Sequence, residues 1–189
     1  MQFDNFMSLR PDTTAPPRLR LAGRLLEAFA LGVALALPAF AVGYWIAVPA
    51  ETLTAAAGSP PTAGDVWPPW ARATGLVITA VPMAALIWAI LGARRCFREM
   101  ASGRLVSPAM TRGLKSMAAG MALSALLRPL AGVAASALAS WAQPPGARSV
   151  SLNVSSDLLV LLVFAAAVWV VAHAIDRAAA VADDHARFV

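Results

Sequence analysis

Four long apolar segments, each close to the length that crosses a lipid bilayer, constrain this chain more than any other feature. They run from Leu25 to Val48, Ala73 to Ala93, Leu114 to Ala142 and Leu158 to Ile175. A helix rises about 1.5 Å per residue, so about 20 apolar residues span a hydrocarbon core about 30 Å thick. Soluble helices of this length carry a polar stripe, and these segments have none. The pattern predicts an all-α polytopic membrane protein with four transmembrane helices in a bundle.

The composition supports this fold class. Hydrophobic residues make up 59% of the 189 residues and charged residues only 13%, about half the charged share of a soluble domain. Four spans and short loops fill the length, so we expect one transmembrane domain over residues 1–189. A mobile cytoplasmic lead over residues 1–20 would precede the spans, and a cytoplasmic helical tail over residues 176–189 would follow them.

Segments rich in basic residues alternate with segments poor in them along the four predicted spans, so the basic residues concentrate on one side of the membrane. Four arginines precede the first span and six basic residues separate the second from the third, whereas the other two loops contain only Arg72 and Arg148. Positive charge stays in the cytoplasm, so both termini and the loop between the second and third spans are expected there. The net charge of +5 thus reflects topology, and we expect no direct nucleic-acid binding.

The first span has a second interpretation, as a cleaved signal peptide with Val48-Pro49-Ala50 at its cleavage site. Its apolar run is about twice the 7–15 residues of a signal-peptide core. We therefore expect the segment to be retained as a transmembrane helix.

Tryptophans lie near the expected outer ends of the spans, and the first outer connection reads as a loop. Trp45, Trp67, Trp70 and Trp141 are placed where indole rings settle among lipid headgroups. The connection over residues 49–72 is rich in Pro, Gly, Thr and Ala, a composition typical of loops.

The connection between the second and third spans carries clear helix boundary signals. We expect the second helix to continue past the membrane and to stop near Gly103, which can adopt the left-handed conformation. Ser107 followed by Pro108 predicts a capped start of the third helix. That helix would begin in the cytoplasm and enter the bilayer after Lys115.

Arg128 is the residue that departs most from the membrane pattern. It lies near the middle of the third span, where an arginine costs about 2.5–3.5 kcal/mol on insertion scales. Pro129 removes a helical hydrogen-bond donor beside it, and Ser124 lies one turn away. These three residues form a predicted intramembrane polar site. One interpretation is a pore, substrate or partner-helix contact, and the other is a purely structural arginine that snorkels or bonds nearby carbonyls.

Small residues recur at helical spacing in two spans. They are Gly32 and Ala36 in the first span and Gly132, Ser136 and Ser140 in the third. Such faces let helix backbones approach closely in lipid. We expect them to pack helices within the chain, and a homo-oligomer interface is the alternative.

Catalytic patterns are missing from the sequence. Paired carboxylates, a glycine-rich phosphate loop and a serine elbow are not found, and Cys96 is the single cysteine. His173 stands alone in the fourth span, so a haem-binding electron-transfer role would need a second ligand from another copy. We therefore expect no enzyme activity, no cofactor and no metal site.

The connection before the third span and the tail carry a family resemblance. The first motif runs from Cys96-Phe97-Arg98 through Gly103-Arg104-Leu105-Val106-Ser107-Pro108 to Leu114 and Gly120, and the second comprises Asp183-Asp184 and Phe188-Val189. In these motifs the chain, from about residue 73 to 189, resembles a bacterial four-helix membrane family known as domain of unknown function 2975. Ala109 departs from the acidic residue often found at its position. The resemblance implies both termini inside and a frequent neighbouring gene for a very small helix-turn-helix regulator.

These features predict a regulatory or sensory protein of the bacterial cytoplasmic (inner) membrane. It would dock a cytoplasmic partner, such as a small helix-turn-helix transcriptional regulator, through charged side chains of its inner face. The predicted docking residues are Arg94, Arg95, Arg98, Arg104, Asp183 and Asp184. The alternative is a small oligomeric transporter or channel subunit with Arg128 in the path.

Overall fold

Five helices make up the regular structure of the residues that the structure describes. The computed structural model describes residues 17–58, 67–103, 107–141, 152 and 155–187, and it describes side chains of the last helix up to residue 178. The helices are α1 (Pro17–Ala47), α2 (Ala50–Ala56), α3 (Pro69–Ala101), α4 (Pro108–Trp141) and α5 (Ser156–Arg187). All of them except α2 contain a stretch long and apolar enough to cross a membrane. The predicted class, an all-α multi-pass membrane protein, is confirmed.

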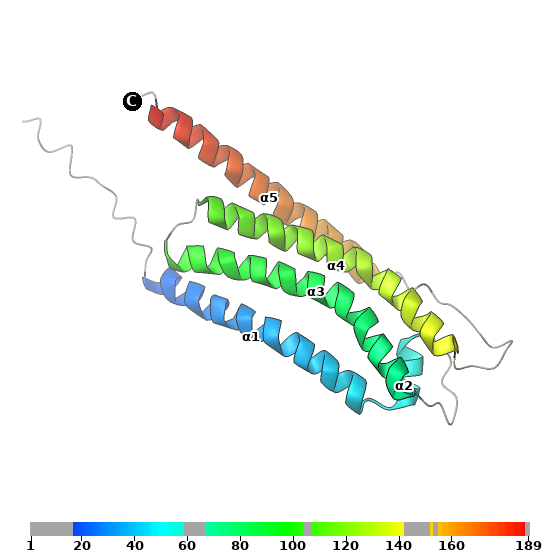
Figure 1. Ribbon diagram of the computed structural model, residues 1–189. Coiled ribbons are helices and arrows are strands. Elements are labelled where there is room, and N and C mark those ends of the chain that lie inside the picture. The colour runs from blue at the N-terminus through cyan, green and yellow to red at the C-terminus, as the bar shows by residue number, and fades with distance from the viewer. Residues whose placement is uncertain (1–16, 59–66, 104–106, 142–151, 153–154, 188–189) are drawn as a thin grey trace, which may run out of the picture.

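The long helices pack as an open row, in the order α1, α3, α4, α5 (Figure 1). Within the described part of the chain, α1 packs against α3 alone among the long helices, and α5 packs against α4 alone. The short helix α2 contacts α4 near the C-terminal half of α4, where both line one cavity. The four long helices therefore pack together, but the first and last of them do not close the bundle against each other.

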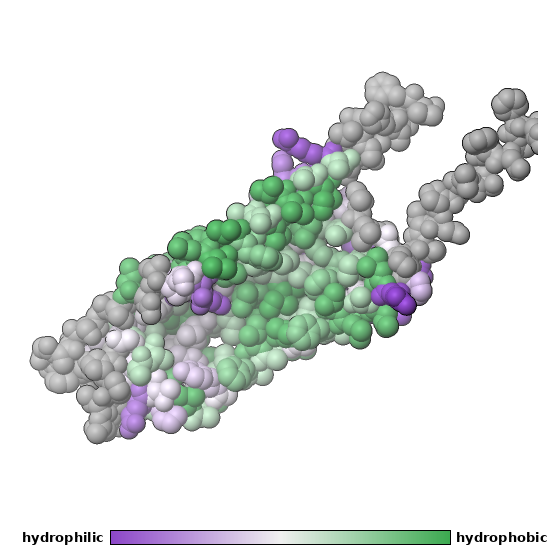
Figure 2. Space-filling model, turned by 180° about the vertical axis from the view of Figure 1, so that it is seen from behind, coloured by the Kyte–Doolittle hydropathy of each residue, from purple (hydrophilic) through white to green (hydrophobic). Residues whose placement is uncertain are grey.

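The helix surfaces suit a hydrocarbon surrounding. Large apolar side chains such as Phe29 on α1 and Val163 on α5 are about 70% exposed. Figure 2 shows hydrophobic residues covering most of the helix surface, with hydrophilic residues mainly toward the two ends. Exposed apolar surface of this extent is stable against lipid tails and not against water.

Glycines allow close backbone contact between α3 and α4. A Cβ atom placed on Gly120 would lie 2.7 Å from the backbone nitrogen of Ala89, and one on Gly92 would lie 2.7 Å from the backbone nitrogen of Met117. No larger residue fits there without moving a backbone. Because lipid tails are as apolar as leucine, such close packing is a main source of helix association in membranes.

The predicted boundaries of the turn between α3 and α4 are confirmed. Gly103 follows the end of α3 with a φ of 80°, the left-handed conformation that favours glycine. The Ser107 hydroxyl accepts a hydrogen bond from the Met110 backbone N–H at 3.1 Å and caps α4. It also donates to the Glu99 carboxylate at 2.9 Å, which ties the two helix ends together.

Three of the long helices contain an internal proline. These residues are Pro38 in α1, Pro82 in α3 and Pro129 in α4. Each removes one backbone donor and crowds the preceding turn, which bends a helix. The bends of α3 and α4 are visible in Figure 1.

The end of the molecule opposite the α3–α4 turn is organised by Arg72 and Trp45. Arg72 Nη1 donates to the carbonyl oxygens of Trp45, Ile46 and Val48 at 2.9 to 3.1 Å. These carbonyls lie at the C-terminal end of α1, where a cation is favourable. The prediction that Trp45 lies among headgroups is wrong, because the residue is only 7% exposed and its ring packs on Gly75 of α3.

We expect Arg72→Gln to lower the free energy of unfolding by about 1–3 kcal/mol, since hydrogen bonds to a charged group stabilise by this order. Unfolding in mixed detergent micelles, followed by tryptophan fluorescence, would measure the change. Arg72→Lys is the control that keeps the charge and loses the planar fork, and an intermediate loss is expected for it. Wild-type stability in Arg72→Gln would contradict this role.

Candidate functional site

The end of the molecule that contains the start of α1 and the α3–α4 turn is called the basic end. Most exposed basic side chains of the described residues lie at this end, whereas Arg128 lies in the middle of α4 and Arg72 at the opposite end. The cluster comprises Arg18, Arg20, Arg24, Arg95, Arg98, Arg112 and Arg177. This distribution is the one expected of a cytoplasmic face.

Two of the predicted docking arginines are engaged inside the chain. Arg94 Nη2 lies 3.3 Å from Glu27 Oε1, and Arg98 reaches the same oxygen through Nη2 at 2.9 Å and Nε at 3.0 Å. Glu27 belongs to α1 and both arginines to α3, so the ion pairs join neighbouring helices. Arg98 is still 58% exposed at its side chain, and Arg94 is 29% exposed. Arg94 therefore mainly joins α3 to α1, whereas Arg98 does so and also leaves part of its guanidinium exposed at the surface.

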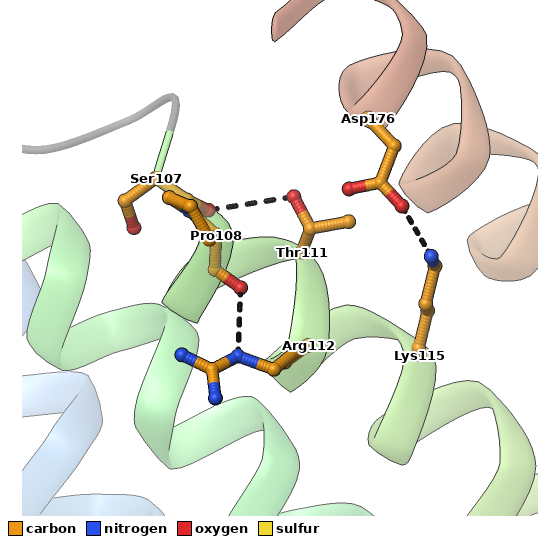
Figure 3. A network of polar contacts seen from close by, with 6 residues as sticks. All are labelled: Ser107, Pro108, Thr111, Arg112, Lys115 and Asp176. Carbon is orange, nitrogen blue, oxygen red and sulfur yellow. Dashed lines mark hydrogen bonds and ion pairs between the residues drawn. The ribbon is translucent and has the colours of Figure 1, made fainter. Parts of the chain in front are cut away.

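A cavity of about 450 Å³ opens at the basic end between α3 and α4. Its lining consists of Arg95, Arg98, Glu99, Ala109 and Arg112. Arg112 donates through Nε to the Pro108 carbonyl at 3.2 Å, a bond that Figure 3 shows. Arg95 is exposed and has no hydrogen-bond or ion-pair partner among the described residues. Arg112 was missing from the predicted docking residues because only the fold brings the first turn of α4 beside the last turns of α3.

The basic end also connects α4 to α5. Lys115 forms an ion pair with Asp176, and the two side chains point toward each other in Figure 3. Thr111, one turn before Lys115, donates its hydroxyl to the Ser107 carbonyl at 3.4 Å. The Lys115–Asp176 pair therefore joins α5 to the start of α4.

Three of the predicted docking residues lie outside what the structure describes. Arg104 is in the undescribed part of the α3–α4 turn. Asp183 and Asp184 lie on the last turns of α5, but their side chains are not described. Their part in docking stays a prediction.

The intramembrane polar site is divided between a buried and an exposed side chain. Ser124 is 1% exposed, and its hydroxyl has no hydrogen-bond partner in the described part of the chain. Arg128, one turn further on α4, is exposed and makes no hydrogen bond or ion pair with any described residue. Pro129 interrupts α4 directly after it.

Only some residues of the predicted small-residue faces are buried between helices. Ser136 and Ser140 are buried, and their hydroxyls donate to carbonyls of their own helix at 2.9 and 3.0 Å. Ala36 is exposed, and a Cβ on Gly32 or Gly132 would meet nothing within 4 Å. The prediction of intramolecular packing is therefore wrong for Gly32, Ala36 and Gly132, which face away from the row.

An apolar cavity of about 380 Å³ lies near the opposite end. It is lined by α1, α2, α3 and α4, with Tyr44, Leu53, Thr79 and Ala135 among its residues. Trp45 donates through its indole nitrogen to the Thr79 hydroxyl at 3.0 Å on its wall. This cavity could not be predicted from the sequence, since α2 falls in a segment that reads as a loop.

Neither the side chains at these sites nor similarity to a known protein assigns a reaction to them. Among the described residues, no three His, Cys, Asp or Glu side chains gather as a metal site requires, and His173 is exposed on α5. Comparisons with family models, with curated proteins and with solved structures found no match for this chain.

Proposed function

We propose that this chain is a non-enzymatic regulatory component of the bacterial inner membrane that docks a soluble cytoplasmic protein at its basic end. The observation that carries the proposal is the arginine-lined cavity between α3 and α4, with a volume of about 450 Å³. The basic end faces the cytoplasm in this proposal, in keeping with the positive-inside rule.

The charges around the cavity favour an acidic partner. Arg95 has no partner among the described residues, and Arg112 is engaged only through Nε. Arg98 shares Glu27 with Arg94, so one carboxylate serves two cations. The cavity lining has three arginines and one carboxylate, Glu99, which accepts a hydrogen bond from Ser107. It therefore keeps positive charge for carboxylates that a partner would present, and Arg–carboxylate pairs are strong and directional.

The resemblance to the domain of unknown function 2975 family supports one kind of partner, a very small helix-turn-helix regulator. Acidic side chains of the regulator would bind Arg95 and Arg112. Binding at the membrane would hold the regulator away from its operators, and release would return it to DNA. The four long helices would then serve as the anchor and as the element that receives a signal.

The test is binding of a small helix-turn-helix regulator encoded beside the gene, as the resemblance implies, to the purified full-length protein in nanodiscs. We expect the double variant Arg95→Glu/Arg112→Glu to raise the Kd at least about tenfold, because two attractive pairs become repulsive. Arg177→Glu is the matched control. It makes the same charge change on an exposed residue of the basic end but lies on α5, outside the cavity, and should leave the Kd within about twofold.

Two outcomes would contradict the proposal. Equal Kd values for the wild type and the double variant would show that the cavity does not dock the regulator. Loss of binding only in nanodiscs that contain anionic lipid would show that headgroups, and not the regulator, occupy the cavity.

A further inference from the structure

Arg128 lies near the middle of α4, and its side chain is exposed. It is midway between Lys115, which pairs with Asp176 at the basic end, and Trp141, which ends the helix and is 71% exposed. About 20 Å of helix separates it from each of them. A guanidinium keeps its charge, so an exposed arginine at this level needs a partner or a path to water.

The residues two turns before and two turns after Arg128 show on which face of α4 it lies. Two turns earlier, Met121 packs with Ala89 of α3 and Ala165 of α5. Two turns later, Ala135 lines the apolar cavity. Residues seven apart share a helix face, so Arg128 belongs to the face of α4 between α3 and α5, two helices that do not contact each other.

Gly132, one turn after Arg128, makes this region accessible to another backbone. A Cβ atom on Gly132 would meet nothing within 4 Å, although glycines elsewhere on α4 are tightly covered. Arg128 and Gly132 together are called the open face of α4. A cation beside a bare glycine provides both a charge to be paired and space for close helix approach.

A second copy of this chain does not fit the open face. Two copies would bring like charges together, and the sequence contains no acidic residue at mid-depth. Glu27 pairs at the basic end, and Asp157 lies in the first turn of α5, at the other end. Lipid headgroups do not fit either, because they lie about 15 Å from the bilayer centre. A transmembrane helix, in contrast, can present a carboxylate at any depth.

We propose that the open face of α4 binds a transmembrane helix of a different protein, with an Asp or Glu at mid-depth paired to Arg128 and its backbone against Gly132. This inference is independent of the proposed docking at the basic end. It gives the protein a partner within the membrane as well as one in the cytoplasm.

The probe is a synthetic leucine-alanine transmembrane helix with one central Glu, compared with the same helix carrying Gln or Leu. Full-length protein labelled at its N-terminus and an acceptor-labelled helix are reconstituted in phosphatidylcholine vesicles, and energy transfer measures association. We expect at least tenfold tighter association of the Glu helix than of the Leu helix. Arg128→Leu should abolish that preference, and Gly132→Leu should weaken association severalfold.

The matched control moves the cation to another face of α4. Leu130 is 64% exposed and lies about 200° around the helix from Arg128, so Arg128→Leu/Leu130→Arg should not regain the preference. The reversed pair, Arg128→Glu with a central-Arg helix, should regain it.

Three results would overturn the inference. One is equal association of the Glu helix with wild type and Arg128→Leu. Another is self-association of the wild type that Arg128→Leu abolishes, which would assign the open face to a second copy. The third is anion flux through vesicles of the protein alone that depends on Arg128, which would make this residue part of a conduction path.

Discussion

Replacing Gly120 by leucine is expected to force α3 and α4 apart and to lower the free energy of unfolding by more than about 3 kcal/mol. Even a Cβ atom at this position would lie 2.7 Å from the Ala89 nitrogen and 2.8 Å from the Ala85 carbonyl oxygen. Both are backbone atoms that cannot rotate away, so the whole helix must move. Unfolding in mixed detergent micelles, followed by tryptophan fluorescence, would measure the loss.

Gly132→Leu is the matched control, since it makes the same change on the same helix where a Cβ meets nothing within 4 Å. The alanine pair gives a sharper comparison, because alanine favours helix over glycine by about 1 kcal/mol. Gly120→Ala should destabilise the protein, whereas Gly132→Ala should be neutral or stabilising. Equal effects at the two positions would show that the α3–α4 contact does not depend on glycine.

The local features of the fold could be predicted from the sequence because they depend on local chemistry. Apolar length determines the four spans, and the boundary signals at Gly103 and Ser107 act within one or two turns. A left-handed glycine and a capping serine have the same effect in almost any helical protein. These boundaries were therefore confirmed in the structure.

The short helix α2 was not predicted, because its stability is not local. Its seven residues are too few to show a hydrophobic period, and Pro49 before it reads as a breaker. Contacts from elsewhere hold it in place. Leu53 and Thr54 are each 3% exposed, and the Trp67 indole donates to the Thr54 hydroxyl at 3.0 Å.

The order of the helices and the glycines at their contacts could not be predicted either. In a chain this rich in small residues, the small-xxx-small pattern occurs on surfaces that face lipid as well as on those that face helices. Gly32 and Gly132 match the pattern and are bare, while Gly92 and Gly120 make the contacts. Only the helix order distinguishes them.

The positive charge of the candidate site could be predicted from the sequence, but the arrangement of its side chains could not. Arginines at the basic end are evident from topology, but the pairing of Arg94 and Arg98 with Glu27 depends on α1 lying beside α3. The same holds for Arg112, which enters the cavity only because α4 folds back along α3. The distribution of charge can be read directly from the sequence, whereas a cavity depends on how the helices pack.

The second large effect is expected for Trp45→Ala, which should free the C-terminal half of α1 from α3. Trp45 is 7% exposed, and its ring occupies the space that Gly75 leaves, since a Cβ on Gly75 would overlap the ring. Its indole also donates to the Thr79 hydroxyl at 3.0 Å.

We expect Trp45→Ala to lower the free energy of unfolding by about 3–5 kcal/mol, as for other buried tryptophans. Among the long helices α1 packs against α3 alone, so once the ring is lost the described hydrogen bonds that still join its C-terminal half to α3 are those of Arg72 at the last turn. A spin-label pair on α1 and α3 should therefore report a wider distance distribution at this end and an unchanged one beside Glu27. Trp70→Ala is the control, since Trp70 is 58% exposed and its loss leaves no cavity. A narrow distribution in Trp45→Ala would show that the ring does not hold α1 in place and that Arg72 or the bilayer is sufficient.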